Sequence, residues 1–157
     1  MATTTLPESS LVGATPSDKI LQVRPFQVVK IIVDKIDAPP GHALSKRDVQ
    51  EIIARLPLNW RAILRCVHIS ASRSATAPVL YDGSEMKLTV AGRGRTWDDT
   101  LHRFLVELAA HALGFKHRTF LHLQSRYAAE VEGAVGPIYA VVHPILADAR
   151  RHGSGVA

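Results

Sequence analysis

One amphipathic segment, residues 97–115, constrains the fold of this chain more than any other part of the sequence. Its apolar side chains recur at intervals of three and four residues, the spacing of one face of an α-helix. They are Leu101, Phe104, Leu105, Leu108, Ala112 and Phe115. Thr96, with Asp99 three positions later, predicts the helix start, and Gly114 predicts an end in a left-handed turn. We therefore expect a core built around this helix.

The segments before this helix have the pattern of β-strands. Residues 63–70 are short and densely apolar, and residues 79–81 lead into Asp82-Gly83, a pair typical of tight turns. Beyond the turn, residues 86–91 alternate between apolar and more polar side chains, which is the two-residue period of a strand. The pattern predicts one strand and then a hairpin directly before the helix.

The N-terminal half also contains two predicted helices. Residues 26–36 are rich in β-branched side chains, but polar residues recur there at helical spacing and Pro25 suits a first helical turn, so we predict a helix. Pro39-Pro40-Gly41 should end it. Ser45 and Asp48 then predict the start of an amphipathic helix. Its apolar face carries Val49, Ile52, Ile53 and Leu56.

The C-terminal part predicts two more helices, over residues 121–131 and 138–150, with a break at 133–137 and a bend at Pro144. A chain of 157 residues with 46% hydrophobic content suits one domain. We expect a flexible arm over residues 1–20, a single domain over 21–151 and a frayed end over 152–157. The predicted class is α+β, with a small mixed sheet and an edge hairpin packed against a central helix and C-terminal helices.

The charge and the cysteine content of the chain limit the range of cellular compartments and binding partners that we expect. The net charge of +5 permits an anionic partner such as nucleic acid, although the basic clusters are short and scattered. The longest apolar runs have four or five residues, too few for a membrane span. Cys66 is the single cysteine, so an internal disulfide cannot form, which suits a reducing compartment. We expect a cytoplasmic protein without membrane anchoring.

The polar side of the central helix carries a motif. Glu107 and His111 lie one turn apart, and Gly114 and His117 follow at intervals of three residues. This run resembles the zinc-binding helix of the zincin metallopeptidases, whose elongated pattern is H-E-x-x-H-x-x-G-x-x-H. In that comparison His111 matches the second histidine, Gly114 the glycine and His117 the third histidine. The resemblance implies a site that holds Zn²⁺ through Glu107, His111 and His117.

The first half of the motif departs from the family. Glu107 stands where the first histidine belongs, and Leu108 occupies the position of the glutamate that activates the zinc-bound water. An alternative alignment treats one alanine of Ala109-Ala110 as an insertion, so that Glu107 matches this glutamate and Val106 the first histidine. In either alignment, one group that the family needs for catalysis is missing from this chain. The methionine turn of the elongated-motif families is also missing, because no methionine follows Met86.

The resemblance extends to the layout of residues 45–150, in which helix, strand, hairpin, motif helix and further helices follow one another. A zincin would place the edge of the hairpin strand at residues 86–90 beside a cleft over the polar helix face, ready to pair with an extended peptide. Glu130 and Glu132 could imitate the downstream glutamate ligand of other zincins. Layout by itself does not establish function.

Other candidate sites have weaker support in the sequence. His102, His122 and His143 are isolated within predicted helices. Ser70, Ser72 and Ser74 lack the G-x-S-x-G pattern of a hydrolase nucleophile. Trp60 and Trp97 are interpreted as core or interface anchors, and Cys66 as a buried thiol.

Three interpretations of the motif remain open at this point. Glu107 and His111 could form a solvated pair with no ligand, the domain could be a degenerate zincin, or it could be a zinc-dependent peptidase. We adopt the second: a zincin-like pseudoenzyme that binds a protein or peptide partner, with zinc binding left open. The alternative from another class is an interaction or assembly module that docks its basic surface on a protein or nucleic acid.

Overall fold

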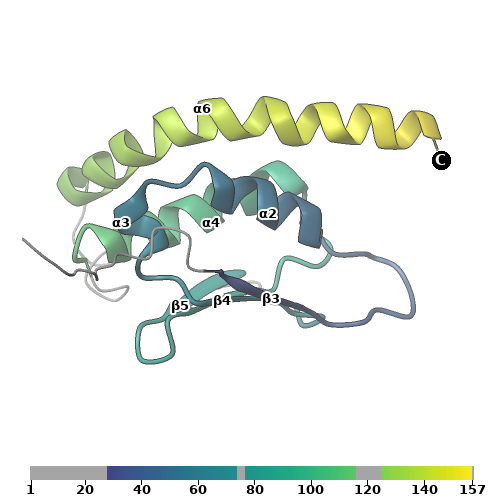
Figure 1. Cartoon of the computed structure of the whole chain (residues 1–157), viewed down its shortest axis with the longest axis horizontal. Helices are drawn as coiled ribbons and strands as arrows, with labels where there is room; N and C mark the ends of the chain where they lie inside the picture. Colours follow the sequence, from purple (N-terminus) through teal and green to yellow (C-terminus); the bar gives the residue numbers. More distant parts are fainter. Residues whose placement is uncertain (1–27, 74–76, 116–124, 157) are drawn as a thin grey trace, which may run out of the picture.

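The computed structural model describes residues 28–73, 77–115 and 125–156, and within them the fold is α+β as the sequence predicts. Four helices lie on one face of a four-stranded sheet (Figure 1). In chain order the elements are β3 (Lys30–Val33), α2 (Lys46–Ala54), α3 (Leu58–Arg61), β4 (Cys66–Ile69), β5 (Val79–Asp82), β6 (Lys87–Val90), α4 (Trp97–Ala112) and α6 (Ser125–Val156).

The sheet is mixed, with the strand order β3-β4-β6-β5. Strands β3, β4 and β6 run parallel, and β5 pairs antiparallel with β6. The predicted hairpin is therefore present, but the expectation that residues 86–90 form its edge is wrong. β6 is held between β4 and β5, so the edge strand of the hairpin is β5.

The prediction of a helix over residues 26–36 is also wrong. The described part of this segment contains β3, which pairs with β4 so that Ile31 lies beside Val67. The amide of Asp34 continues the ladder by donating to the Ile69 carbonyl at 2.9 Å. Stiff β-branched side chains favour a pleated strand, and pairing with β4 outweighs the helical spacing of the polar residues.

Helix α4 packs on the sheet with the predicted apolar face inward. The side chains of Leu101, Phe104, Leu105 and Leu108 are all 0% exposed. They meet buried side chains of the sheet, among them Val67, Ile69, Val79, Leu88 and Val90. Trp60 of α3 is buried in the same core, whereas Trp97 lies partly buried at its margin. The core therefore lies between the sheet and the helices above it.

The predicted helix starts are confirmed by their hydrogen bonds. At α2 the Ser45 amide donates to the Asp48 carboxylate at 2.8 Å, and the Asp48 amide donates to the Ser45 hydroxyl at 3.1 Å. This reciprocal pair is a capping box, which satisfies two amides that the helix leaves without partners. At α4 the Thr96 hydroxyl accepts from the Asp99 amide at 3.4 Å.

The end of α4 is fixed by Gly114, which adopts φ 92° as predicted. The Gly114 amide donates to the His111 carbonyl, and the Phe115 amide donates to the Ala110 carbonyl. These two bonds make a Schellman motif, in which the glycine takes a left-handed conformation that other residues adopt only at a cost. The chain therefore leaves α4 after Ala112, one residue beyond His111, and in a defined direction.

We expect Gly114→Ala to lower the free energy of unfolding by about 1 kcal/mol, because a methyl group strains the left-handed backbone. An added Cβ would meet nothing within 4 Å, so the cost is conformational rather than steric. Gly133→Ala is the matched control: it also fills open space, but within a helix, and should stabilise by about 0.5–1 kcal/mol. Urea unfolding of both variants measures the difference. Equal effects of the same sign would contradict this account of the helix end.

The two predicted C-terminal helices are one continuous helix, so the predicted break at residues 133–137 is wrong. Pro137 and Pro144 lie inside α6 but on its exposed side, where their rings do not disturb the core. The helix persists through them because its inner side is fastened by Val131, Val135, Val142 and Leu146, each at most 1% exposed. It continues to Val156, through most of the segment expected to fray.

Helix α6 packs on α4 and α2 and forms the outermost layer (Figure 1). Arg150 holds its C-terminal half against α2 by donating to both carboxylate oxygens of Asp48, at 2.7 and 3.1 Å. Its guanidinium also lies over the Trp97 ring, 4.4 Å from the ring centre. Neither α6 nor any other helix in the described residues is long and apolar enough to cross a membrane.

Candidate functional site

The motif residues lie where α4 passes the edge strand β5. Glu107 and His111 are one turn apart, and 3.4 Å separates Glu107 Oε2 from His111 Nε2. Glu107 is only 7% exposed, so the interpretation of these two residues as a solvated pair does not describe it. Gly114 ends the helix as the motif requires, whereas His117 lies outside the described residues.

The Glu107 carboxylate is hydrogen-bonded to the backbone of β5. Its Oε2 accepts from the Tyr81 amide at 3.0 Å. In an antiparallel ladder, the backbone groups of every second residue point to the neighbouring strand. The Ala91 amide donates to the Pro78 carbonyl, so the backbone groups of Pro78, and two residues later those of Leu80 opposite Thr89, point to β6. The Tyr81 amide, one residue further, points away from β6. Glu107 thus satisfies a backbone donor on the outer side of the edge strand, the kind of group that otherwise invites another strand.

Tyr81 joins the site from the strand side. Its ring lies against the His111 imidazole with ring centres 4.7 Å apart, and its hydroxyl donates to the Ile63 carbonyl. Burial raises the pKa of the Tyr81 phenol, and the nearby charge of Asp82 adds to this effect. Tyr81 was not among the sequence candidates, although the alternation of residues 79–81 places it on the inward face with Val79.

Leu108, which the zincin alignment places at the position of the general base, lies in the core. Leu108 is 0% exposed and faces the sheet rather than the pair of polar residues beside it. The alternative alignment requires an inserted residue at Ala109-Ala110, but α4 runs without interruption from Trp97 to Ala112. The helix therefore keeps Glu107 and His111 at an ordinary spacing of four residues. This geometry favours the alignment in which Glu107 occupies the first-ligand position.

The described residues do not by themselves make a zinc site. Zinc centres in proteins use three or four ligands, and the motif supplies two here, Glu107 and His111. One of them already binds the Tyr81 amide. Among residues 28–73, 77–115 and 125–156, no three His, Cys, Asp or Glu side chains form a group that could hold a metal ion. His111 Nε2 is buried and has no hydrogen-bond partner within that part of the chain.

A second polar cluster lies at the carboxyl ends of β3 and β4. Asp34 Oδ1 lies 2.8 Å from His68 Nε2, and Oδ2 accepts from the Ala71 amide at 3.0 Å. The His68 hydrogen bond is the main cause that lowers the pKa of the Asp34 carboxyl, with the Ala71 amide next. His42 contacts the Asp34 carbonyl at 2.7 Å. The two carboxylate oxygens of Asp34 thus connect the end of β3 to His68 of β4 and to Ala71 in the loop after β4.

Because the pKa of Asp34 is lowered in the folded state, its ionised form contributes stability above its ordinary pKa of 3.8, and this contribution is lost as pH falls below it. Asp34→Asn should therefore destabilise the protein at pH 7 and have a shrinking effect as the solution is acidified towards pH 3. Urea midpoints at several pH values measure this. Asp37→Asn, an exposed neighbour, is the control, and a constant effect of Asp34→Asn at every pH would contradict the account.

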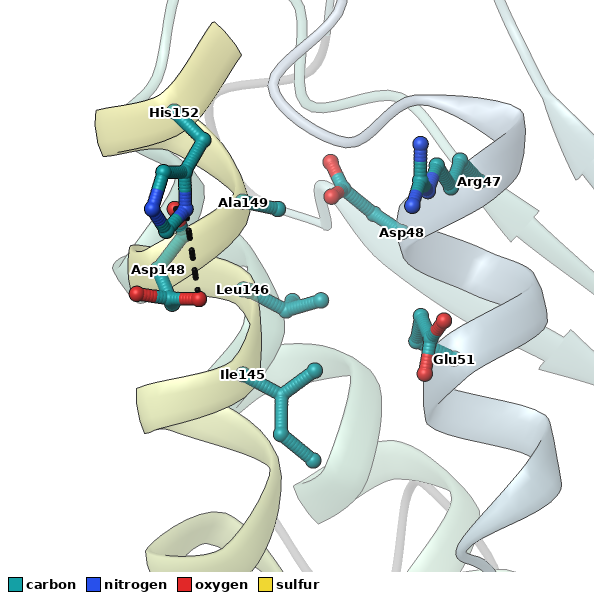
Figure 2. Close-up of a pocket in the computed structure, with 8 residues that line it drawn as sticks. All are labelled: Arg47, Asp48, Glu51, Ile145, Leu146, Asp148, Ala149 and His152. Carbon is teal, nitrogen blue, oxygen red and sulfur yellow. Dashed lines mark hydrogen bonds and ion pairs between the residues drawn. The ribbon is translucent and has the colours of Figure 1, made fainter.

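A pocket between α2 and α6 is lined by Arg47, Asp48, Glu51, Ile145, Leu146, Asp148, Ala149 and His152 (Figure 2). Each of its three carboxylates is already paired with an arginine: Asp48 with Arg150, Glu51 with Arg55, and Asp148 with Arg151. His152 Nδ1 also lies 3.4 Å from the Asp148 carboxylate. The negative charges of the pocket are therefore already balanced by arginines of the same chain. The residues that line the pocket form no recognisable motif in the sequence.

The remaining sequence candidates are dispersed. His102 pairs with Glu132 across α4 and α6 at 3.0 Å, and His143 stacks on Trp97 with ring centres 4.7 Å apart. Ser70 is buried and accepts from the Ser72 amide, and Cys66 is only partly buried. Glu130 is exposed on α6. His122 and Ser74 lie outside the described residues. The structure thus brings Glu107, His111 and Tyr81 together at the motif, while His102 with Glu132 and His143 with Trp97 form separate pairs between α4 and α6.

The chain matches no family model, no curated protein and no solved structure.

Proposed function

We propose that this chain is a zincin-like domain that has lost peptidase activity and works by binding a protein or peptide. The observation that carries the proposal is the hydrogen bond from the Tyr81 amide to Glu107. The carboxylate in the first-ligand position stabilises the edge of the sheet, which is a structural role. A residue that stabilises the sheet in place of binding a metal fits a domain that keeps the zincin fold and has lost the catalytic reaction.

Two further features support the proposal. Leu108, at the position that the zincin alignment gives to the general base, is buried and has no titratable group, and loss of such a base costs about 10²–10⁴ in rate. The antiparallel strand β5 at the sheet edge lies next to the motif helix, which is the relation expected of a zincin, although the strand is β5 rather than residues 86–90. Leu80 on that strand is 45% exposed and offers an apolar contact for a partner.

The proposal predicts no peptide hydrolysis with or without added Zn²⁺, and a wild type whose stability does not change with a chelator. The assay uses a mixed pool of unstructured peptides and follows new amino termini. His111→Ala is the matched variant, because it removes the one motif histidine in the described structure. Hydrolysis that requires Zn²⁺ and disappears in His111→Ala would overturn the proposal in favour of an active peptidase.

A further inference from the structure

The two edges of the sheet differ in how their outward backbone groups are satisfied. The edges are β5 and β3, with β4 and β6 between them. On β5, the Glu107 carboxylate accepts from the Tyr81 amide on the outer side of the strand. Protection of this kind blunts an edge that would otherwise pair with another strand. Within residues 28–73, 77–115 and 125–156, no side chain protects the edge of β3 in this way.

The outer side of β3 presents the backbone groups of Ile31 and Val33. The Lys30 amide donates to β4 at 3.0 Å and the Asp34 amide at 2.9 Å, so residues 30, 32 and 34 turn their backbone groups towards β4. The alternate residues, Ile31 and Val33, turn theirs the other way. Their amides and carbonyls have no hydrogen-bond partner in the part of the chain that the structure describes. A row of such groups recognises another β-strand.

The side chains beside this edge include exposed apolar groups. Val28 is 84% exposed, Ile32 39% and Val33 43%. They are three of the seven large hydrophobic side chains that are exposed in the described residues. Exposed apolar side chains therefore gather next to backbone groups that lack partners. A strand that paired with β3 would cover the first and satisfy the second.

The charges at the two ends of β3 indicate which strand this is. Lys30 and Asp34 lie at equal intervals on either side of Ile32. All three side chains are on the side of the sheet away from the helices, because the alternate residue Ile31 packs against the core. A two-fold axis through Ile32 sets Lys30 of each copy opposite Asp34 of the other. A parallel pair would instead set like charges beside each other at both ends.

We propose that β3 pairs antiparallel with β3 of a second copy of this chain, so that the two sheets become one continuous sheet. Ile31 of each copy then faces Val33 of the other, and each such pair exchanges both of its N–H···O bonds. Ile32 meets its own symmetry copy at the axis. Ile32 and the Lys30–Asp34 pairs occupy the non-hydrogen-bonded positions, where side chains on neighbouring strands lie closest. An interface that uses the same patch twice has the symmetry most common among dimers.

The contacts that Asp34 already makes leave it able to bind Lys30 of a second copy. Asp34 Oδ1 lies 2.8 Å from His68 Nε2, and Oδ2 accepts from the Ala71 amide at 3.0 Å. A neutral imidazole can donate the first of these hydrogen bonds, so the bond does not by itself balance the negative charge. An ionised carboxylate has about four acceptor positions. The Asp34 side chain is 39% exposed, which leaves room for the ammonium group.

The other charged residues near β3 lie outside the contact. Lys35 and Asp37 follow the paired segment and have opposite signs. Arg65 directly precedes β4, so it is about 10 Å or two strand spacings from a strand that joins β3, a distance at which salt screens its charge. The directly opposed charges are therefore the two Lys30–Asp34 pairs, and both are attractive.

The length of the paired segment sets the strength of the contact. Residues 30–34 span about 16 Å of strand. A contact of this length buries less than the roughly 1,200 Å² typical of stable complexes. We therefore expect a weak, reversible dimer that forms between micromolar and millimolar concentration.

Disulfide cross-linking tests which edge of the sheet is used. In a Cys66→Ser background, the thiol of Ile32→Cys would meet its symmetry copy at the axis, within reach of a disulfide. Leu80→Cys is the matched control, because Leu80 is similarly exposed, at 45%, but lies on β5. Under mild oxidation of the full chain, Ile32→Cys should form a covalent dimer about tenfold faster than Leu80→Cys.

Sedimentation equilibrium measures the same contact without a cross-link. Val33→Pro removes an outward amide and keeps every hydrogen bond to β4, and proline is tolerated on edge strands. Val33→Ala removes a similar amount of apolar side chain and keeps the amide. The proline variant should dimerise about tenfold more weakly than the alanine variant, because each copy loses one donor to its partner. Circular dichroism establishes that each variant remains folded.

A charge reversal tests the antiparallel direction. Lys30→Glu sets two carboxylates against each other at both ends of the contact and should weaken the dimer about fivefold. Lys35→Glu is the matched control, because it makes the same change beyond the paired segment, and it should have little effect. Equal effects of the two reversals would contradict the register that places Lys30 opposite Asp34.

A wild type that stays monomeric at the highest concentration reached would overturn the proposal. So would faster cross-linking at Leu80 than at Ile32, or equal dimerisation of the two Val33 variants. Hydrogen exchange supplies a further check: Ile31 and Val33 amides that are already protected in the dilute monomer would show that another segment of the same chain covers β3. None of these results involves Glu107, so they are independent of the proposed function.

Discussion

Arg150→Ala is expected to lower the free energy of unfolding by about 3 kcal/mol, because it leaves the buried Asp48 carboxylate without its cation. The Asp48 side chain is 7% exposed and Arg150 binds both of its oxygens. The guanidinium also donates to the Ala43 carbonyl at 3.2 Å and covers the Trp97 ring. The variant therefore loosens α6 from α2 and α4 together. Chemical denaturation followed by circular dichroism measures the loss.

Arg103→Ala is the matched control for this prediction. Arg103 is also an arginine on a helix with an acidic partner, Asp99 at 3.1 Å, but both side chains are more than 40% exposed. Exposed pairs of this kind contribute about 0–1 kcal/mol. A cost for Arg150→Ala no larger than that of Arg103→Ala would show that the link between α6 and α2 does not stabilise the fold.

Glu107→Ala is expected to cost about 2–3 kcal/mol, because the Tyr81 amide then lacks its acceptor in a buried place. Glu107→Gln keeps a carbonyl oxygen at the same reach and should cost about 1 kcal/mol or less. The comparison separates the hydrogen bond from the charge. Thermal and urea unfolding of both variants supply the values.

Equal and small costs for the Ala and Gln variants would mean that the Tyr81 hydrogen bond does not hold the edge strand. Equal and large costs would mean that the negative charge of Glu107 is required, as it would be for a ligand of a cation. Only a large difference between the two variants fits the structural role that we assign to Glu107.

Much of the local structure could be predicted because it depends on short-range physics. The caps at Ser45 and Thr96, the turn at Asp82-Gly83 and the left-handed Gly114 each need only a few neighbouring residues. The apolar stripe of α4 likewise follows from its own periodicity. These elements were found where the sequence places them.

The predictions that are wrong depend on contacts between segments that lie far apart in the sequence. Residues 26–36 contain a strand because β4 lies beside it, and no local pattern reports that pairing. α6 continues through Pro137 because its inner side chains pack on α4, which outweighs the loss of one helix hydrogen bond. The sequence leaves Glu107 open as a solvated residue, a ligand or, in the alternative alignment, the catalytic glutamate, because it does not reveal that the Tyr81 amide lies 3.0 Å away.

The most direct test of the central claim is hydrogen exchange at the Tyr81 amide, measured by NMR with and without added Zn²⁺. If Glu107 serves the sheet edge, this amide is strongly protected in the wild type, loses protection in Glu107→Ala, and does not respond to the metal. A Tyr81 amide that exchanges freely in the wild type would contradict the account. So would one whose protection falls when Zn²⁺ is added, since the carboxylate would then have left the strand to bind the metal.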